Sequence, residues 1–269
     1  MRTGLKIGFI GGGMMAGAIV AGLTRQQVLP PGQIYVSDHK EERCAELLEQ
    51  YGIHASVSAD FISEMDVLVL AVKPQAAAAA LDEVRGALGR GTLVISIVAG
   101  LTLAALAEKL PEQPLVRVMP NTPLAVGAGM SAWARGSQVS EEQAALVQEI
   151  FSASGEALEV KEALLDAVTG LSGSGPAYGF LVIDALADGG VAAGLPRAAA
   201  IRLAAQTMLG AAQMVLATGE HPDVLRDQVT SPAGTTIAGV RVLEQQGLRG
   251  ALIDAVIKAA ERSRELGKK

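Results

Sequence analysis

The sequence predicts an α/β domain with a mostly parallel sheet, followed by an all-α domain. Short apolar runs alternate with helical patterns as far as residue 160, a glycine-rich turn follows the first run, and only helical patterns follow residue 162. Alternation of this kind is typical of parallel sheets that helices cover on both faces. At 269 residues the chain has room for two modest domains, each with its own core.

The first strand is expected over residues 5–10, and it leads into a turn that begins at Gly11. A helix follows, with apolar residues repeating at helical spacing. Gly11, Gly13 and Ala16 form the pattern Gly-x-Gly-x-x-Ala, which between a strand and a helix marks a dinucleotide-binding Rossmann domain. Gly11 permits the tight turn, Gly13 lets the backbone approach a pyrophosphate, and Ala16 lets the helix pack closely on the strand.

Asp38 ends the second predicted strand, over residues 33–38. An acidic residue at this point accepts a hydrogen bond from the ribose 2′-hydroxyl of NAD, whereas a basic residue favours the 2′-phosphate of NADP. His39 and Lys40 follow Asp38 directly, so the signals conflict, and the predicted cofactor is NADP(H) or NAD(H). The alternative is that these three residues form a solvated turn before a helix at residues 41–50.

Three further strands carry turn-forming residues at their carboxyl ends. They are expected at residues 66–72, 92–98 and 115–119, and they end in Lys73-Pro74, Ala99-Gly100 and Pro120-Asn121-Thr122-Pro123. Open α/β sheets bind ligands beyond the carboxyl ends of their strands, so these segments are candidate ligand contacts. Taken singly, each segment also fits an ordinary turn.

The alternation of strands and helices ends after residue 160. An edge strand is expected at residues 129–135, then a helix that begins at Ser140 with a Ser-x-x-Gln capping box, then a last strand at residues 155–160. Because no strand pattern follows, we place the domain boundary near Glu162. The predicted domains are a dinucleotide-binding domain over residues 1–162 and an all-helical dimerisation and substrate-binding domain over residues 163–269.

Only helices are expected after this boundary. A flexible turn at residues 171–176 precedes the first long helix, a short helix begins at His221, and a final amphipathic helix spans residues 248–266. The helix at residues 197–217 is apolar nearly all round, which indicates burial on most sides. A domain of about 100 residues can hardly enclose such a helix, so we expect a partner subunit to cover it.

Residues 229–239 (VTSPAGTTIAG) place four hydroxyls and a proline directly before a helical pattern. Backbone N–H groups at a helix start have no intrahelical partners and lie at the positive end of the helix dipole. Together with the hydroxyls of Ser231, Thr235 and Thr236, they would form a cradle for a carboxylate or a phosphate. The alternative is an ordinary N-cap with Ser or Thr, although one cap needs fewer hydroxyls.

Composition argues against several classes of function. The net charge of −6 and the lack of a Lys/Arg run argue against binding to nucleic acid or to an anionic membrane surface. We find no signal peptide and no apolar stretch of the ~18 residues that span a membrane, so we expect a soluble, cytoplasmic protein. The single cysteine, Cys44, excludes an internal disulfide, and with three scattered histidines it gives no metal site.

With these motifs the chain resembles pyrroline-5-carboxylate reductase, the family that catalyses the last step of proline biosynthesis. The resemblance covers essentially the whole length. Its most specific parts are residues 169–178 (TGLSGSGPAY), 184–190 (DALADGG) and 227–239, supported by 71–74 (AVKP) and 119–123 (MPNTP). That family pairs a Rossmann domain with a helical domain that interlocks two subunits, often arranged further as a decamer. The resemblance therefore implies a homodimer or a larger homo-oligomer.

The resemblance also implies a role for each matching residue. The glycine-rich turn would hold the cofactor pyrophosphate through Gly11, Gly12, Gly13, Met14 and Met15. Further cofactor contacts would be Asp38 and Ser58 beside the adenosine half, Ala71, Val72, Lys73, Pro74, Val98, Ala99 and Gly100 along the cofactor, and Asn121 near the nicotinamide. The substrate carboxylate would be bound by Ser231 and by the backbone of Gly234, Thr235 and Thr236. The Thr236 hydroxyl would reach the ring nitrogen in the catalytic step, and Glu162 would contact the substrate region.

Two positions depart from the family pattern. Ala233 replaces a common glycine of the Ser-Pro-Gly-Gly turn, which calls the backbone geometry of that turn into question. Asp38 stands where many relatives carry a Ser or Thr compatible with NADP, which leaves the cofactor preference open.

The chemistry of the candidate residues agrees with reduction of an imine. Hydride transfer to a carbonyl normally needs a proton donor such as Lys, His or Tyr at the oxygen. The candidate site carries hydroxyls and glycines but no such acid, and Tyr178 is the alternative donor. A cyclic imine is basic enough to arrive protonated, so its reductase needs mainly orientation and an anion clamp. We therefore predict reduction of 1-pyrroline-5-carboxylate to L-proline. The alternatives are a reductase of another cyclic imine, such as a six-membered homologue, and a regulatory module that binds the dinucleotide without turnover.

Overall fold

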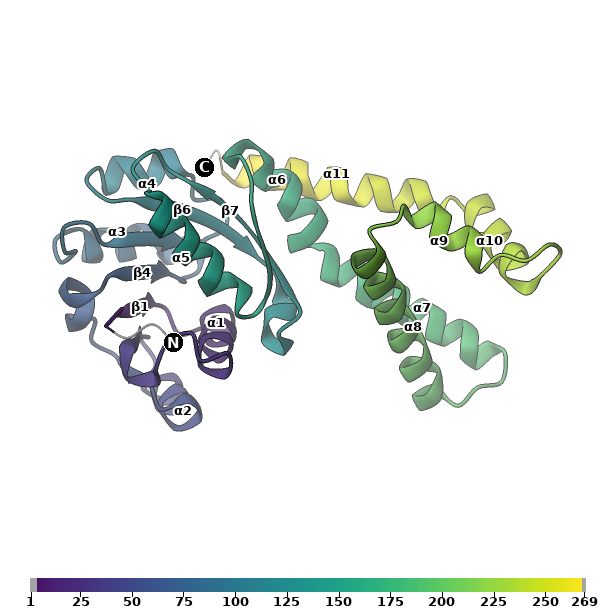
Figure 1. Cartoon of the computed structure of the whole chain (residues 1–269), viewed down its shortest axis with the longest axis horizontal. Coiled ribbons are helices and arrows are strands. Elements are labelled where there is room, and N and C mark those ends of the chain that lie inside the picture. Colours follow the sequence, from purple (N-terminus) through teal and green to yellow (C-terminus); the bar gives the residue numbers. More distant parts are fainter. Residues whose placement is uncertain (1–3, 268–269) are drawn as a thin grey trace. The chain divides into compact units, whose positions relative to one another are not determined.

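A computed structural model describes residues 4–267 of the chain. By its contacts the chain divides into two compact units. The first unit runs to Ser174 and includes the segment from Lys258 onward, and the second unit is Gly175–Ile257 (Figure 1). By contacts the first unit continues beyond Glu162 to Ser174, and the domain boundary expected near Glu162, where the alternation of strands and helices ends, stays a prediction.

The first unit contains one eight-stranded sheet in the order β3-β2-β1-β4-β5-β6-β7-β8. Neighbouring strands pair in parallel except β6 and β7, which are antiparallel. The strands are β1 (Ile7–Ile10), β2 (Ile34–Ser37), β3 (His54–Ser56), β4 (Val67–Leu70), β5 (Leu93–Ser96), β6 (Leu115–Pro120), β7 (Gly129–Arg135) and β8 (Gly155–Glu159). The Rossmann-type α/β fold predicted from the sequence is confirmed.

The strand order reverses between β1 and β4. From β1 the chain adds β2 and β3 on one side, and it then crosses back to place β4, β5 and β6 on the other. Ile10 pairs with Leu70 in register, so the two strands end side by side. A crevice at the carboxyl ends of strands on either side of such a reversal is where open α/β sheets bind their ligands.

Helices cover both faces of the sheet, because side chains of successive strand residues alternate between two cores. The helices of this unit include α1 (Met14–Arg25), α2 (Glu41–Tyr51), α3 (Ala77–Arg85), α4 (Leu103–Lys109) and α5 (Glu141–Ser152). In β1, Phe9 faces the core that α1, α2 and α5 cover, whereas Ile10 faces the core under α3 and α4. The predicted capping box is present, since Ser140 Oγ accepts from the Gln143 N–H and the Gln143 side chain accepts from the Ser140 N–H.

One strand prediction is wrong in position. Residues 129–135 do form β7, but this strand lies between β6 and β8 and is not at the edge of the sheet. The edge is β8, which pairs in parallel with β7 and whose residues are mostly exposed. The sequence signal for β7 was a mixture of small and apolar residues, which also suits an inner strand near the end of a sheet.

The first unit ends in a series of short turns, and the end of the last helix also belongs to it. After β8 come the 3₁₀ turn η5 (Glu162–Leu164), α6 (Leu165–Val168) and the π-helical turn η6 (Thr169–Gly173). The last helix, α11 (Leu248–Leu266), contributes its carboxyl-terminal part to this unit. There the Ser263 hydroxyl donates to Asp166 Oδ1 at 2.6 Å.

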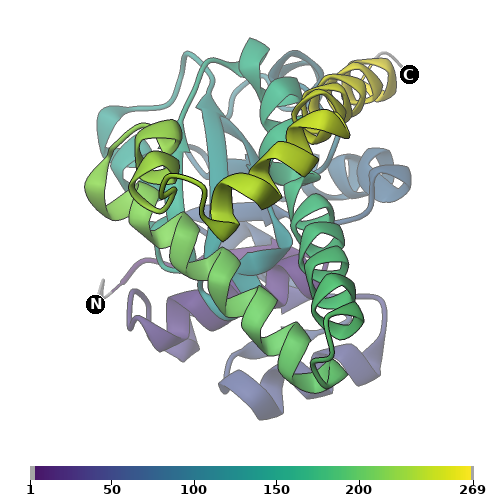
Figure 2. The same ribbon diagram turned by 90° about the vertical axis from the view of Figure 1, so that its right-hand side faces the viewer.

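The second unit is helical throughout (Figure 2). It contains α7 (Gly175–Ala192), α8 (Arg197–Thr218), α9 (Pro222–Gln228), α10 (Thr235–Gln245) and the start of α11. Its own core is small and centres on Ala187, Ala200 and Ala204 between α7 and α8. The predicted short helix begins at His221, whose side chain caps it by accepting from the Asp223 N–H.

Helix α8 is largely uncovered within the chain. Leu203 and Leu216 are 55% and 78% exposed although α8 is apolar along most of its length. By length and composition α8 is also the one described helix that could cross a membrane, with a mean hydropathy of 1.2. The prediction that no apolar stretch reaches this length was therefore wrong, because an 18-residue window of α8 tolerates the few charges present.

Candidate active site

The glycine-rich turn joins β1 to α1 at the reversal point of the sheet. Gly11 has a φ of +99°, a region that residues with a side chain rarely adopt. Its N–H donates to Ser37 O at 2.8 Å, and a Cβ at this position would lie 2.7 Å from Ala71 O. Gly11 therefore fits both the tight turn and the close approach to β4 that the sequence pattern predicts.

Gly13 precedes α1 and faces open space. It is the N-cap of the helix, no side chain caps that end, and a Cβ on Gly13 would meet nothing within 4 Å. The first N–H groups of α1 consequently lack intrahelical partners and lie at the positive end of its dipole. Ala16 is buried against the strand as predicted. This end of α1 has the backbone geometry that accepts a phosphate group.

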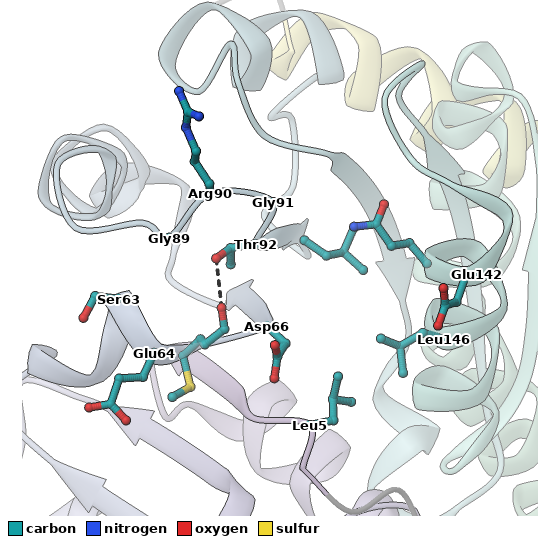
Figure 3. Close-up of a pocket in the computed structure, with 13 residues that line it drawn as sticks. Leu5, Ser63, Glu64, Asp66, Gly89, Arg90, Gly91, Thr92, Glu142 and Leu146 are labelled. Carbon is teal, nitrogen blue, oxygen red and sulfur yellow. Dashed lines mark hydrogen bonds between the residues drawn. The ribbon is translucent and has the colours of Figure 1, made fainter.

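A cavity of about 380 Å³ volume lies elsewhere in the first unit, and it is a poor candidate for the active site (Figure 3). Asp66 and Thr92, which immediately precede β4 and β5, help to line it at the amino ends of the strands. The Thr92 hydroxyl donates to Met65 O at 2.8 Å, and Glu64 pairs with Lys6. Its polar groups serve the fold, and ligands of open sheets bind at the opposite ends of the strands.

A cleft of about 730 Å³ opens at the carboxyl ends of β1, β2 and β4. Thirteen residues line it: Gly11, Gly13, Met14, Asp38, His39, Lys40, Glu42, Arg43, Glu46, Ala71, Val72, Lys73 and Ala76. Seven of them were predicted as cofactor contacts, and they come from three separate strand ends. The open Gly13 backbone, the uncapped helix and this volume fit a dinucleotide.

Three other predicted cofactor contacts lie next to the cleft and do not line it. Gly12 is buried, and a Cβ there would approach Leu47 Cδ1 to 3.0 Å. Met15 is half-buried in the first turn of α1, and Pro74 begins the 3₁₀ turn η3 (Pro74–Ala76).

Asp38 is fixed to the glycine-rich turn. Its Oδ2 accepts from the Gly12 N–H at 2.8 Å, its Oδ1 accepts from the Lys40 N–H at 3.0 Å, and its side chain is only 11% exposed. His39 Nδ1 lies 3.3 Å from Oδ1. Each carboxylate oxygen has two lone pairs, so the group can still accept from a ribose hydroxyl. Asp38 is therefore both a support of the turn and a candidate ribose contact.

Arg43 lines the same cleft and was missed in the sequence. It lies in α2, its Nε donates to Gly12 O at 2.6 Å, and its Nη1 pairs with Glu46 Oε2 at 2.8 Å. The available signal was a basic residue in the first turn of the helix that follows Asp38. In the sequence it reads as one charge among several on an exposed helix face.

Ser58 is separated from the cleft in the structure. It helps to line a different cavity of about 380 Å³, together with Tyr35 and His54 among others. Its Oγ accepts from the Asp60 N–H at 3.2 Å, and its carbonyl accepts from the Ser56 hydroxyl. Its role beside the adenosine half stays a prediction.

The loop after β5 carries Val98, Ala99 and Gly100. Val98 is buried, and its N–H donates to Ser96 Oγ at 3.2 Å. Gly100 has a φ of +81°, and a Cβ on it would lie 3.6 Å from Leu266 O near the end of α11. This loop is thus held on both sides before α4 begins.

Asn121 is a buried connector at the end of β6. Its Nδ2 donates to the carbonyl and the hydroxyl of Ser172 at 3.2 and 3.3 Å, and its Oδ1 accepts from the Met130 N–H at 2.9 Å. The amide thereby ties β6 and β7 to the π-helical turn η6. π-Helical turns occur frequently at functional sites. The predicted position of Asn121 near the nicotinamide stays a prediction.

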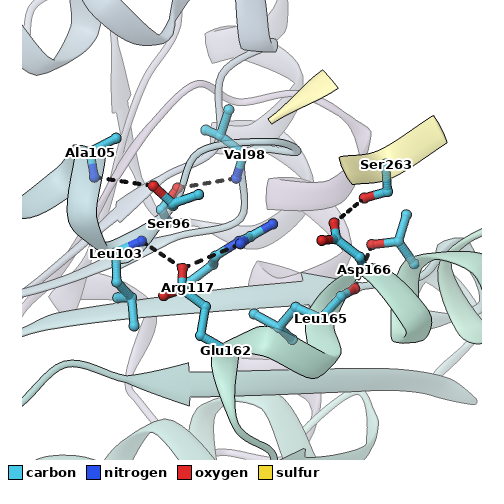
Figure 4. Close-up of polar contacts among 11 residues, drawn as sticks. Ser96, Val98, Leu103, Ala105, Arg117, Glu162, Leu165, Asp166 and Ser263 are labelled. Atoms are coloured by element: carbon cyan, nitrogen blue, oxygen red, sulfur yellow. Dashed lines mark hydrogen bonds and ion pairs between the residues drawn. The ribbon is translucent and has the colours of Figure 1, made fainter. Parts of the chain in front are cut away.

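Glu162 connects η5 to α4. Its Oε1 accepts from the Leu103 N–H at 2.7 Å and pairs with Arg117 Nη1 at 3.3 Å (Figure 4). A carboxylate at a helix start is stabilised by the free N–H groups there. Both contacts use Oε1, so Oε2 has no partner among the described residues.

The predicted anion cradle belongs to the second unit. Gly234 is the N-cap of α10, and no side chain caps this helix. The hydroxyls of Ser231, Thr235 and Thr236 make no hydrogen bond within the described chain, whereas Thr230 donates to Arg226 O. The turn is closed by the Gly234 N–H, which donates to Ser231 O at 3.0 Å. The three hydroxyls are thus free for a ligand and do not serve as an N-cap.

Comparison with known proteins follows the same two-part division. A family model described as pyrroline-5-carboxylate reductase dimerisation matches residues 162–266, and one described as NADP oxidoreductase coenzyme F420-dependent matches residues 6–100. A pyrroline-5-carboxylate reductase of Arabidopsis thaliana is 49% identical over 262 residues, covering 97% of this chain and 95% of that protein. The chain belongs to the pyrroline-5-carboxylate reductase family.

Other family members and solved structures agree with this assignment. The pyrroline-5-carboxylate reductase of Escherichia coli is 45% identical, with 98% of each chain covered. The Coxiella burnetii reductase structure superposes with a TM-score of 0.92 at 37% identity, covering 97% of this chain and 98% of that one. The Plasmodium falciparum reductase, solved with NADP bound, gives 0.89 at 31% identity, covering 99% and 100%. The Rossmann domain and the dimerisation domain are therefore those of this reductase family.

Proposed function

We propose that this chain catalyses the NAD(P)H-dependent reduction of 1-pyrroline-5-carboxylate to L-proline. Its identity to pyrroline-5-carboxylate reductases along nearly the whole length supports this reaction. The start of α10 provides the main structural support. There the hydroxyls of Ser231, Thr235 and Thr236 remain uncommitted beside an uncapped helix end. A small anionic substrate is the ligand that suits this arrangement.

The cofactor-binding residues act in binding and orientation. The N–H groups from Gly13 to Met15 would bind the pyrophosphate, and Asp38 would accept from the adenine ribose. The segments 71–74 and 98–100 would lie along the remainder of the cofactor, with Asn121 near the nicotinamide and Ser58, which lines a neighbouring cavity, beside the adenosine half. When bound, the reduced nicotinamide supplies the hydride that the imine carbon receives.

The substrate-binding residues act by holding the carboxylate and the ring nitrogen. Ser231 and the N–H groups of Thr235 and Thr236 would bind the carboxylate, Gly234 would shape the turn through its own N–H bond to Ser231 O, and the Thr236 hydroxyl would lie at the nitrogen. Glu162 contributes to the substrate region through its free Oε2. The substrate arrives as the protonated imine, so the chain needs no separate acid at the reacting bond.

Tyr178 is unsuited to the role of proton donor. Its hydroxyl lies 3.4 Å from Ala255 O, where it donates within the second unit between α7 and α11. This contact favours a packing role for the ring and supports the proposal that the substrate brings its own proton.

The assembly follows from the uncovered helices of the second unit. We infer that α8 is covered by a second copy of the chain, which gives a homodimer, and that dimers can assemble further into a decamer. The protein would act in the cytoplasm, where the single cysteine stays reduced.

One assay tests the reaction and its alternatives. Purified protein is mixed with NADH or NADPH and with the five-membered or the six-membered cyclic imine carboxylate, and loss of the near-ultraviolet absorbance of the reduced nicotinamide is followed. We expect turnover with the five-membered ring, with proline as the product. A clear preference for the six-membered ring would identify another imine reductase. Cofactor binding without turnover on either imine would identify a regulatory module.

A further inference from the structure

Arg43 holds one side of the glycine-rich turn. Its Nε donates to the Gly12 carbonyl at 2.6 Å, and the side chain is 27% exposed. A Cβ on Gly17 would lie only 2.7 Å from Arg43 Nη2, so the guanidinium is fitted against the first turn of α1. The group is therefore fixed in place between α2 and α1 before any ligand arrives.

Holding this carbonyl also fixes the direction of the next N–H. In a trans peptide the C=O of one residue and the N–H of the following residue point to opposite sides. The described chain has no cis peptide bond. Since Arg43 draws Gly12 O towards α2, the Gly13 N–H points the opposite way. Gly13 is also the residue of the turn beside which a Cβ would meet only open space.

Asp38 fixes the other peptide of Gly12. Its carboxylate accepts from the Gly12 N–H at 2.8 Å, so the N–H and the C=O of one residue are bound by two oppositely charged side chains. Gly12 is also closely surrounded, because a Cβ on it would lie 3.0 Å from Leu47 Cδ1 and 3.1 Å from Val36 Cγ1. The turn has one backbone orientation as long as both side chains are present.

We propose that Arg43 is a positioning residue for cofactor binding, which orients the Gly12–Gly13 peptide so that the Gly13 N–H faces the pyrophosphate of NAD(P)H. The inference rests on the proposed function, because it assumes the dinucleotide in this cleft. It assigns Arg43 a role through the backbone and not through contact with the 2′-phosphate of NADPH.

The test exploits the fact that the pyrophosphate is common to both cofactors. Arg43→Met removes the guanidinium and keeps much of the apolar stem. We expect the Kd of NADH and the Kd of NADPH to rise by the same factor, about ten-fold, since a hydrogen bond to a charged group is worth at least that much. Binding is measured by fluorescence titration.

Glu49→Gln provides the matched control, because Glu49 is exposed on the same helix and does not line the cleft. It removes an acidic charge from α2 and leaves both Arg43 contacts, so we expect cofactor affinity within about two-fold of the parent. Arg43→Lys keeps the charge but lacks the fixed fork of donors, so its loss should fall between those of the parent and Arg43→Met. If Arg43→Met does not fold, Arg43→Lys carries the comparison, with thermal unfolding to show that the fold is intact.

Amide hydrogen exchange of the free protein gives a second readout. Exchange of the Gly11–Met14 amides should be faster in the Arg43 variant than in Glu49→Gln. An equal loss for NADH and NADPH together with faster exchange supports the proposal. Unchanged affinity for both cofactors overturns it, and so does a loss confined to NADPH, which would mean direct contact with the 2′-phosphate. Turnover of the parent enzyme is measured separately, so failure of the proposed reaction is distinguished from failure of this inference.

Discussion

Ser231 and Thr236 lie at the same helix start, yet they would meet different parts of the substrate. The Ser231 hydroxyl would bind the carboxylate, whose charge is the same before and after hydride transfer. The Thr236 hydroxyl would bind the ring nitrogen, which changes from a protonated imine to an amine. A contact that is equal in the ground state and the transition state affects binding alone, whereas one that changes affects the rate.

We therefore expect removal of these two hydroxyls to change different kinetic constants. Ser231→Ala should raise the KM of the imine by about ten- to a hundred-fold and leave kcat nearly unchanged, since a charge-assisted hydrogen bond is worth about 1.5–3 kcal/mol. Thr236→Ala should lower kcat as well. Steady-state kinetics at saturating NADPH measure both effects.

Thr235→Ala is the comparison for these two variants. It removes a neighbouring hydroxyl and keeps the backbone N–H of residue 235, which is the group expected to bind the carboxylate. Cofactor affinity should change by no more than a few-fold in all three, since the glycine-rich turn belongs to the first unit. Near-normal kcat and KM in both Ser231→Ala and Thr236→Ala would mean that the hydroxyls take no part in substrate binding.

Asp38 combines cofactor selection with support of the turn. Its carboxylate would repel the 2′-phosphate of NADPH, so Asp38→Ser should increase the kcat/KM ratio of NADPH to NADH. Because the same carboxylate accepts from the Gly12 N–H, affinity for both cofactors should fall somewhat. Kinetics with each cofactor give the ratio, and an unchanged ratio would rule out the ribose contact.

The turn before α10 places Ala233, which replaces a common glycine of the family, in a left-handed backbone conformation. Ala233 has a φ of +58°, in the left-handed region where a Cβ is unfavourable and where glycine is at no disadvantage. A Cβ on Gly234 next to it would overlap with Ser231 Oγ, so a side chain there would require the Ser231 side chain to move. The element is therefore built with a small amount of strain at the point where substrate is expected.

Ala233→Gly should relieve that strain and keep the turn. The left-handed conformation costs a residue with a Cβ about 1–2 kcal/mol, and the added freedom of glycine in the unfolded chain offsets about 0.4–1 kcal/mol. We expect a net stabilisation of roughly 0.5 kcal/mol in denaturant unfolding at fixed protein concentration. Ala238→Gly, in the interior of α10, should instead destabilise by about 1 kcal/mol. Destabilisation of similar size by both changes would contradict the strain at Ala233.

Elements with a local signal could be predicted, and those that depend on distant partners could not. The pattern around Gly11 fixed the first strand, turn and helix, and Ser140 with Gln143 fixed the start of α5. The position of β7 in the sheet depends on β8 pairing beside it, which no residue of β7 encodes. The contact of Arg43 could not be predicted for the same reason, because its partner Gly12 is 31 residues away in the sequence.

At the scale of the whole molecule, the second unit leaves several large apolar side chains exposed. Phe180, Leu181 and Leu216 are each at least 65% exposed. Large apolar side chains that are exposed to this degree are expected at a protein interface. The sequence predicted this from α8 alone, because a helix that is apolar nearly all round requires cover from more than one side.

We expect an obligate dimer or a larger homo-oligomer, with an interface above the ~2,000 Å² that permanent pairs bury. Analytical ultracentrifugation at micromolar concentration measures the state directly. Leu203→Glu on α8 should weaken assembly and lower activity in parallel, whereas Glu83→Gln, on an exposed face of α3 in the first unit, should affect neither. A folded and active monomer would disprove the assignment.

The split of the first unit between two parts of the chain also governs how it can be made. The ribosome delivers Ser263 and the end of α11 after every residue of the second unit. Asp166 receives its hydroxyl partner, and Gly100 its neighbouring backbone, only when translation is nearly complete. A gene fragment that stops at residue 174 therefore encodes a nucleotide-binding unit that lacks the end of α11. During translation, the helices of the second unit are synthesised before the first unit is complete.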